Sequence, residues 1–310
     1  MRVGLIGATG MVGQHYLALL QNHPWFELTH VAASEERTGK PYPQDNWFAP
    51  GIPPNLTLQS PDNPDCDLLF LCADRDPRPY AEQGIRVVAS SARLRRDPEV
   101  PVIIPEINGD QEWPLGIACK PNCAVQSFLL PLWPLHQRFG IERVAVTTLQ
   151  SLSGGGIELM NTIDPDPLIP GEEEKCEWEP FKILGTTFPL SVSCHRVPRH
   201  FGHTAQVSVA FHTRPTRDQI IDAWNTFEGL DLPTAPKQPV TYVEGSPGLN
   251  LMSVYAGRLR ECPVHQWRFT ALSHNVIRGA AGSGILIAEQ WMQHAQKPLL
   301  RSATQELPVS

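Results

Sequence analysis

Three glycines near the start of the chain constrain its fold more than any other feature. Gly7, Gly10 and Gly13 lie between an apolar run at residues 2–6 and residues 11–22, whose apolar positions have helical spacing. Between a strand and a helix, such glycines permit a tight turn, close approach of a pyrophosphate and close helix–strand packing. We therefore predict a dinucleotide-binding turn, and a purely structural turn is the alternative. The residues expected to contact the cofactor are Gly7, Thr9, Gly10, Met11 and Val12.

Strand-like and helix-like segments alternate through the N-terminal part of the chain. Residues 67–72 (DLLFLC) are continuously apolar, as expected for a strand that is buried on both faces. The alternation predicts an α/β fold, with a Rossmann-type doubly wound parallel sheet in a first domain over residues 1–122. Its further strands are expected at 26–33, 86–89 and 102–104, with a helix near 80–83.

The second half of the chain has a different pattern. Residues 143–149, 191–197, 204–212 and 267–272 alternate like strands of a half-exposed antiparallel sheet. Helices are expected at 172–183, 218–227 and 284–294. We predict an α+β substrate domain over 123–282 with a mixed or antiparallel sheet. A last helix at about 283–300 could pack back on the first domain.

Composition excludes several classes of protein. The 310 residues are 41% hydrophobic and 18% charged, as in a globular chain of about two domains. The formal net charge of −7 argues against nucleic-acid binding. We find no apolar run long enough to cross a membrane, and MRVGLIGATG leads directly into a strand, so no signal peptide is expected. Seven cysteines without a CxxC pair favour a reduced, cytoplasmic chain with no metal site.

The end of the second predicted strand indicates which dinucleotide binds. An acid at this point is typical of NAD sites, where it bonds the ribose hydroxyls. Here small residues are followed by Ser34, Arg37 and Thr38. Two hydroxyls and a guanidinium suit a 2′-phosphate, so we predict NADP(H) as the cofactor. A solvated charged loop is the alternative, and Glu35 or Glu36 could bind the ribose instead.

Cys123, in the PNC sequence at residues 121–123, is a candidate nucleophile. It is predicted to lie in the first turn of a helix, where the positive end of the helix dipole lowers the pKa of a thiol. A small buried residue without chemistry is the alternative and the usual fate of cysteine. Pro131 and Pro134 are expected to bend this helix or end it early.

Eight segments, taken together in their order, resemble one known family. They are GATGMVGQ, NHPWFELTHVAASEERTGKPY, VPVIIPEIN, PNC, LQSLSGGG, GEEEKCEWEPFKIL, CHRVPRHFGH and ALSHNVIRGAAG. The chain is identified as a member of the aspartate-semialdehyde dehydrogenase family, in its archaeal and fungal branch. The resemblance implies NADPH-dependent reduction of L-aspartyl-4-phosphate to L-aspartate-4-semialdehyde, in the biosynthesis of lysine, methionine and threonine. It also implies a homodimer or homotetramer.

The resemblance assigns the chemistry to three residues. Cys123 would form a thioester with the aspartyl group and release phosphate, which splits one hard reduction into two easier steps. Gln150 would orient the substrate beside it. His203 would be the general acid/base, with a pKa suited to proton transfer near neutrality. Without the resemblance a surface role would suit His203 better, and we interpret His195 and His200 as surface or structural.

Substrate and cofactor contacts are implied in the same way. Arg196 would hold the substrate α-carboxylate as a bidentate fork. Glu172 would bind the ammonium and Lys175 the phosphate, from one helical face; a solvated charge run is the alternative reading of EEEK. Arg95 would bind the phosphate, with Arg93 and Arg96 as competitors. Further contacts are implied for Asn122 at the phosphate and for Ser153, Gly154 and Asn275 at the cofactor.

The chain departs from the family pattern at several positions. Ala124 stands where a hydroxyl residue usually follows the nucleophile, and Cys119-Lys120 replaces a polar pair. Ser90-Ser91 stands where Ser-Asn is common. Two other functions therefore stay open: a malonyl-CoA reductase-like enzyme on the same scaffold, and a non-catalytic NADP-binding paralogue. Glu172 argues against the first, because malonate has no ammonium.

Overall fold

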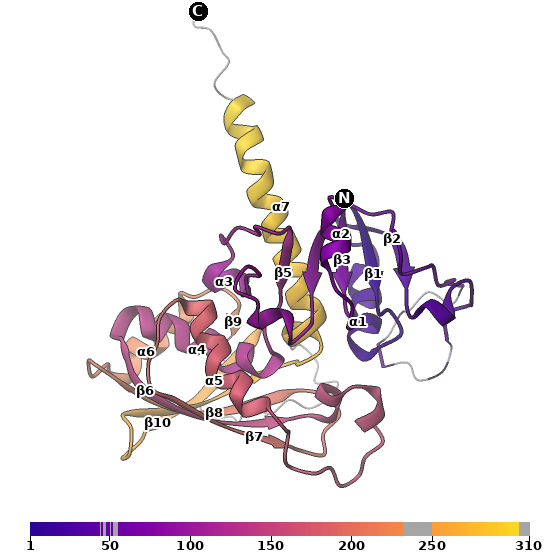
Figure 1. Cartoon of the computed structure of the whole chain (residues 1–310). Helices are drawn as coiled ribbons and strands as arrows, with labels where there is room; N and C mark the ends of the chain where they lie inside the picture. Colours follow the sequence, from indigo (N-terminus) through magenta and orange to yellow (C-terminus); the bar gives the residue numbers. More distant parts are fainter. Residues whose placement is uncertain (44, 46–47, 50, 52–54, 232–249, 304–310) are drawn as a thin grey trace, which may run out of the picture.

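The computed structural model describes residues 1–43, 45, 48–49, 51, 55–231 and 250–303. Five parallel strands form the first sheet, in the order β2-β1-β3-β4-β5 (Figure 1). The predicted doubly wound parallel sheet is therefore confirmed. Its elements are β1 (Arg2–Ile6), α1 (Met11–Leu20), β2 (Glu27–Ala32), β3 (Leu68–Leu71), α2 (Arg78–Glu82), β4 (Arg86–Ala89), α3 (Pro105–Asn108) and β5 (Ile117–Cys119).

The last strand of this sheet is not the predicted one. Residues 102–104 form no strand: Val102 makes a single bridge to Cys119, and β5 occupies the sheet position instead. Both segments are apolar and buried, so hydrophobicity could not distinguish them. Pro105 begins α3 directly afterwards, which limits residues 102–104 to a short extended connection.

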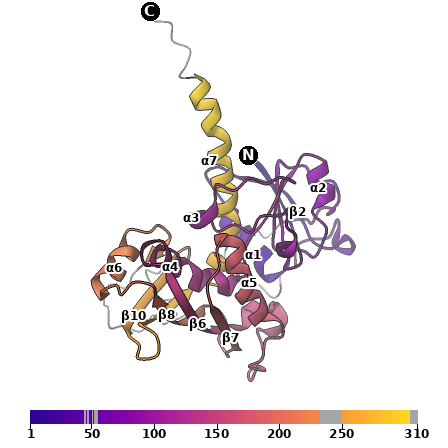
Figure 2. The same cartoon turned by 60° about the vertical axis from the view of Figure 1, so that its left-hand side comes forward.

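The second sheet has six strands in the order β7-β6-β8-β11-β10-β9. The two outer pairs, β7 with β6 and β10 with β9, are parallel. The pairs between them, β6 with β8, β8 with β11 and β11 with β10, are antiparallel, so the sheet is mixed, as predicted. Its strands are β6 (Ile141–Gln150), β7 (Leu190–Arg196), β8 (His203–Phe211), β9 (Leu230–Asp231), β10 (Val254–Glu261) and β11 (Trp267–Ser273). Three helices, α4 (Cys123–Phe139), α5 (Glu172–Leu184) and α6 (Arg217–Asn225), lie on one side of this sheet (Figures 1 and 2).

Helix α4 continues through both of its prolines. We predicted that Pro131 and Pro134 would bend the helix or end it early. They do not end it early, because α4 extends to Phe139, and a bend stays a prediction. The Asn122 side chain accepts a hydrogen bond from the Ala124 N–H at 2.7 Å and caps the helix start. Dense packing of the helix against the second sheet outweighs the backbone hydrogen bonds that proline removes. The buried side chains of α4 include Phe128, Leu129, Leu130, Leu132 and Leu135.

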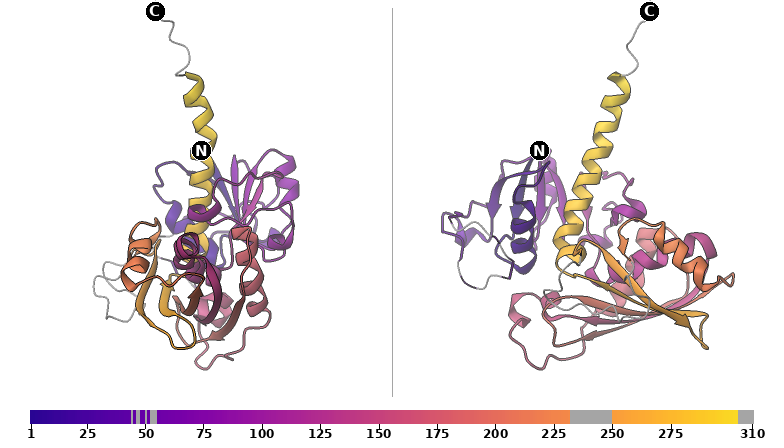
Figure 3. Two further views of the ribbon diagram at one scale, coloured as in Figure 1. Left: turned by 90° about the vertical axis from the view of Figure 1, so that its left-hand side faces the viewer. Right: turned by 180° about the vertical axis from the view of Figure 1, so that it is seen from behind.

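The last helix, α7 (Gly282–Ala303), begins between the two sheets and extends away from the body of the molecule (Figure 3). Its first turns pack into the core of the first sheet: Ile285 and Ala288 share a buried cluster with Val3, Leu5 and Tyr16. The chain thus returns to the first sheet after completing the second.

The glycine turn is as tight as predicted. Gly7 has φ +88°, and a Cβ on Gly13 would lie 2.2 Å from the carbonyl oxygen of Gly7 and 2.7 Å from Ala8 Cα. Helix α1 therefore starts against the backbone of the turn, with its N-terminal N–H groups available to a phosphate. A dinucleotide pyrophosphate fits this arrangement.

The Gly13→Ala variant is expected to lose about 1–3 kcal/mol of stability, because backbone atoms that meet the new methyl group cannot move aside cheaply. Chemical denaturation of the cofactor-free protein measures this loss. Gly10→Ala is the matched control, since its Cβ would meet only the Gly7 oxygen at 3.5 Å. It should lose less than about 1 kcal/mol, as alanine is a poorer helix N-cap. Equal stability of the two variants would refute this account of the turn.

Candidate active site

The candidate residues come together where the carboxyl edge of the first sheet meets the second sheet. Each stands at the end of an element. Cys123 is the first residue of α4, and Glu172 is the first residue of α5. Gln150 ends β6, Arg196 ends β7 and His203 begins β8. Gln150 and Arg196 are direct partners in the β6–β7 register, so the sheet sets their spacing.

Cys123 and His203 are in contact. The Cys123 Sγ lies 3.2 Å from the His203 Nε2. On the other side of the ring, Nδ1 accepts a hydrogen bond from the Ser151 backbone N–H at 3.2 Å. Because a backbone N–H can only donate, the neutral imidazole must carry its proton on Nε2. The proton of His203 therefore points at the sulfur.

His203 is fully buried, and this changes its protonation. Burial, followed by the nearby charge of Arg196, lowers the pKa of His203 to about 3. The sequence suggested an imidazole that titrates near neutrality. In the structure the ring is instead neutral at pH 7, because the charged form would be desolvated.

Burial also governs the Cys123 thiol. Burial first, and the Glu172 carboxylate next, raise the pKa of Cys123, while Lys120 and Arg95 act in the opposite direction. The expected lowering by the helix N-terminus is thus outweighed in the free protein. A thiolate at this position needs a cation to stabilise it.

Glu172 is buried and binds neighbouring side chains, so it is not part of a solvated run of charges. Its two oxygens accept hydrogen bonds from Asn122 Nδ2 and Lys175 Nζ, both at 2.8 Å. Burial tends to raise the pKa of Glu172, but these hydrogen bonds and one from Gln150 outweigh it and lower the pKa. The carboxylate is therefore charged at neutral pH. Four of the predicted residues form one connected network.

Of the three candidate arginines, Arg95 is the buried one. Its Nη1 donates to Glu179 Oε1 at 2.5 Å, and the other oxygen of Glu179 accepts from the Asn122 N–H at 2.7 Å. Arg96 instead pairs with Glu174 at 2.6 Å and is half-exposed, and Arg93 is exposed. Arg95 thus faces the site, but its charge is already balanced by a carboxylate.

The loop after β6 packs closely on the site. A Cβ on Gly154 would lie 2.9 Å from Arg196 Nη1 and 3.1 Å from His203 Cε1, so a side chain there would displace Arg196 and press on His203. The Asn275 amide oxygen accepts from the Gly202 N–H at 2.9 Å, and its Nδ2 donates to Ser153 Oγ at 2.9 Å. The Asn275 and Ser153 side chains thus hold this loop together. Their contact with a cofactor stays a prediction.

The residues predicted to bind the 2′-phosphate follow β2. Ser34, Arg37 and Thr38 are all exposed and belong to a single turn of 3-10 helix and its ends. Glu35, the alternative ribose ligand, is bound by Arg75 Nη1 at 3.1 Å. The exposed guanidinium of Arg37 is therefore the charged group in this turn that could bind a phosphate.

Sequence reasoning missed two residues that shape the site. Ser151 selects the tautomer of His203 through its backbone N–H, and no sequence pattern signals a backbone contact. Glu179 balances the charge of Arg95. Its position two turns after Glu172 on the same face of α5 was an available signal.

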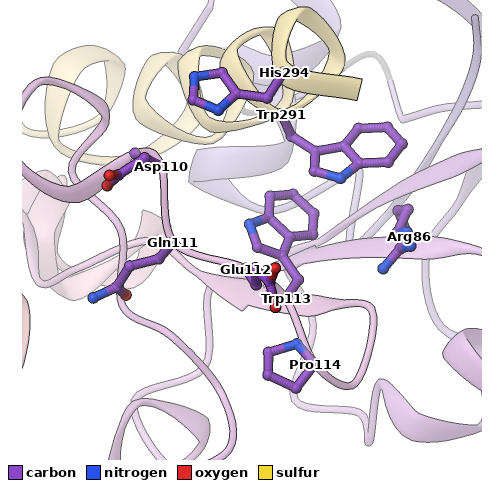
Figure 4. A pocket seen from close by; sticks show the side chains of 9 residues that line it. Arg86, Asp110, Gln111, Glu112, Trp113, Pro114, Trp291 and His294 are labelled. Carbon is purple, nitrogen blue, oxygen red and sulfur yellow. The ribbon is translucent and has the colours of Figure 1, made fainter. Parts of the chain in front are cut away.

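The described part of the chain has a separate cavity of about 550 Å³ at the amino edge of the first sheet, away from these residues (Figure 4). Two tryptophans lie there, Trp113 and Trp291, with ring centres 5.7 Å apart. Among the described residues, no group of three or more His, Cys, Asp or Glu is placed to hold a metal. No described helix is both long and apolar enough to span a membrane.

Comparisons with known proteins agree on one family. The model for the semialdehyde dehydrogenase NAD-binding domain matches residues 2–112, and that for the semialdehyde dehydrogenase dimerisation domain matches 166–278. An aspartate-semialdehyde dehydrogenase of Archaeoglobus fulgidus is 35% identical over 93% of this chain and 96% of its own. A malonyl CoA reductase (NADP) of Metallosphaera sedula is 31% identical over 93% and 96%. The crystal structure of the Candida albicans aspartate semialdehyde dehydrogenase with NADP has a TM-score of 0.78 and 29% identity, covering 93% of this chain and 97% of its own.

Proposed function

Because this chain belongs to the aspartate-semialdehyde dehydrogenase family, we propose that it reduces L-aspartyl-4-phosphate to L-aspartate-4-semialdehyde with NADPH and releases phosphate. This reaction serves the biosynthesis of lysine, methionine and threonine. One observation carries the proposal: Cys123 Sγ lies 3.2 Å from His203 Nε2 at the carboxyl edge of a dinucleotide-binding sheet. A nucleophile, a proton donor and a cofactor site meet there.

In the proposed mechanism the Cys123 sulfur attacks the acyl carbon as a thiolate, after its proton has passed to solvent. The bond from that carbon to the phosphate oxygen breaks, phosphate leaves, and a thioester remains on the protein. NADPH, when bound, supplies a hydride to the thioester carbon. His203 gives its Nε2 proton to the carbonyl oxygen as this carbon becomes tetrahedral, and takes it back as the carbon–sulfur bond breaks.

The substrate contacts follow from charge and position. Arg196 is proposed to hold the α-carboxylate, and Glu172 the ammonium. Glu172 is charged and buried beside Gln150, which supports its role and that of Gln150 in orienting the substrate. Lys175 and Arg95 are proposed to bind the phosphate, with Asn122 between them: its side chain contacts Glu172, and its N–H contacts Glu179.

NADP(H) is proposed to lie across the carboxyl edge of the first sheet. Its pyrophosphate would rest on the glycine turn, which has room for no side chain at Gly7 or Gly13. The 2′-phosphate would meet Ser34, Arg37 and Thr38. The nicotinamide end would reach the loop after β6, near Cys123. The residues proposed there are Ser153, Gly154 and Asn275.

We infer that the chain forms a homodimer, because residues 166–278 match a dimerisation domain; a homotetramer is the larger assembly to test. A division at residue 122 into a cofactor domain and a catalytic domain is supported by the placement of β1–β5 before it and β6–β11 after it. A cytoplasmic location is supported by seven free thiols.

An assay with two acyl donors tests the function. Aspartyl phosphate should be reduced with NADPH, more slowly with NADH, and malonyl-CoA should be a poor substrate. The malonyl-CoA reductase of M. sedula is similar enough to make this comparison necessary. Preference for malonyl-CoA would overturn the proposal. Binding of NADPH without reduction of either donor would favour a non-catalytic paralogue.

A further inference from the structure

Lys120 is a buried cation that the mechanism above does not use. It follows β5 directly, and its backbone N–H donates to the carbonyl oxygen of Ala89 at 3.1 Å, at the carboxyl end of β4. Three residues later Cys123 begins α4. The backbone of Lys120 is therefore held at the sheet edge, three residues before the nucleophile. Only 6% of Lys120 is exposed.

Within the described residues, the Lys120 ammonium makes no hydrogen bond and no ion pair. The other cations near Cys123 differ in this respect. Arg95 is paired with Glu179, and Lys175 with Glu172. A buried charge without a partner costs stability, so its presence points to an anion that it meets during function.

The candidate anion is the sulfur of Cys123. Burial, and then the charge of Arg95, lower the pKa of Lys120, while Cys123, Cys72 and Glu179 act in the opposite direction. Glu179 is already paired with Arg95, and burial raises the pKa of the Cys72 thiol to about 12. Cys72 is therefore neutral at physiological pH. The charged or titratable groups that face Cys123 from the surrounding elements are Glu172 from α5, His203 from β8, Arg196 from β7, and Arg95 with Lys120 from the first sheet's edge.

His203 cannot stabilise the thiolate of Cys123 as a cation or as a base in the free enzyme. Its Nε2 already carries a proton, because Nδ1 accepts from Ser151, so it cannot take the thiol proton at that atom. Its neutral ring also provides no full positive charge. It can donate a hydrogen bond to a thiolate that another group has stabilised.

We propose that Lys120 is a positioning residue that acts through Cys123: its ammonium stabilises the thiolate form of the sulfur, against the burial and the Glu172 charge that disfavour it. The thiol proton passes to solvent, and His203 Nε2–H then donates to the sulfur. The proposal deepens the proposed function, on which its catalytic consequence rests. It assigns activation of the nucleophile to the lysine and proton transfer to the substrate oxygen to the histidine.

Alkylation by iodoacetamide tests this without substrate or cofactor. The sulfur–carbon bond forms as iodide leaves, and the rate follows the thiolate fraction. Modification of the Cys123 peptide is followed by mass spectrometry from pH 5 to 10. In Lys120→Met the midpoint should move to higher pH, and the rate at pH 7 should fall about tenfold or more. Lys120→Arg should stay near the wild-type profile.

A second lysine provides the matched control. Lys182 donates to the carbonyl oxygens of Arg95 and Asp97 at 2.7 and 2.6 Å. Lys182→Met should lose stability and keep the alkylation profile, whereas Lys120→Met should unfold at the same or a higher temperature. Lys120→Gln is the second variant should the methionine variant fail to fold.

Three results would overturn the proposal. One is an unchanged Cys123 profile in folded Lys120→Met or Lys120→Gln. Another is a clear loss of stability in Lys120→Met together with an unchanged alkylation profile of Cys123, which would indicate a structural role for Lys120. The third is an unchanged profile with a higher KM for inorganic phosphate in the reverse reaction, which would make Lys120 a phosphate ligand. The alkylation readout stands even if aspartyl phosphate is not the substrate, so the two failures are distinguishable.

Discussion

Cys123→Ser is expected to reduce kcat/KM for aspartyl phosphate by about 10⁴-fold or more, because a hydroxyl is rarely ionised near neutral pH and an oxygen ester accepts hydride less readily than a thioester. NADPH affinity should change less than about threefold, since the glycine turn is untouched. Steady-state kinetics and fluorescence titration with NADPH measure the two effects. A trapped, acylated Cys123 peptide from the wild-type enzyme should be absent from the variant.

Cys262→Ser is the matched control. This cysteine lies after β10, its backbone N–H donates to the Gln266 carbonyl at 3.0 Å, and it is remote from the site. Its substitution should leave kcat/KM unchanged. Reduction by Cys123→Ser at more than about one hundredth of the wild-type rate would be incompatible with a thioester mechanism.

His203→Asn is expected to lower kcat by about 10²–10⁴-fold, because the substrate oxygen loses its proton donor. Asparagine keeps a polar group near Ser151 and limits the packing change. Alkylation of Cys123 at pH 7 should fall less in this variant than in Lys120→Met, because Lys120 is proposed to stabilise the thiolate while His203 only donates a hydrogen bond to it. A kcat near that of the wild type would exclude His203 as the acid/base.

The same variant should be less sensitive to acid. The pKa of His203 is about 3 in the folded protein and 6.5 when unfolded. The unfolded chain therefore binds more protons between pH 6.5 and 3, and folding stability is lost as pH falls through this window. The loss is about 1.4 kcal/mol for each pH unit below 6.5. His203→Asn should lose correspondingly less between pH 6.5 and 5.5, as measured by denaturation at each pH.

Local patterns predicted much of this fold. The glycine turn, the alternation in the first domain and the helix at 172–183 each depend on residues close in sequence, and each is present. The misses depend on distant contacts. Residues 102–104 and 117–119 compete for one sheet position, and α4 passes two prolines because other elements hold it.

In the candidate site, too, local features could be predicted from the sequence, whereas features that depend on distant contacts could not. Cys123 begins its helix as predicted, but the sign of its pKa shift is set by burial and by Glu172, Lys120 and Arg95, which lie in other segments. The tautomer of His203 depends on the backbone of Ser151. Sequence patterns identify which groups are present, whereas their protonation follows from what surrounds them in the folded chain.

The pairing of Gln150 with Arg196 across β6 and β7 has a consequence for substrate length. Both residues are carried by hydrogen-bonded strands, so the sheet fixes the spacing of their backbone positions, and the proposed carboxylate site at Arg196 cannot shift along the sheet relative to Gln150. With its carboxylate at Arg196, an acyl phosphate with one more methylene would require the sulfur of Cys123 to lie at a different position. Redesign for longer substrates should therefore begin at the first turns of α4 and α5 and leave the strands unchanged.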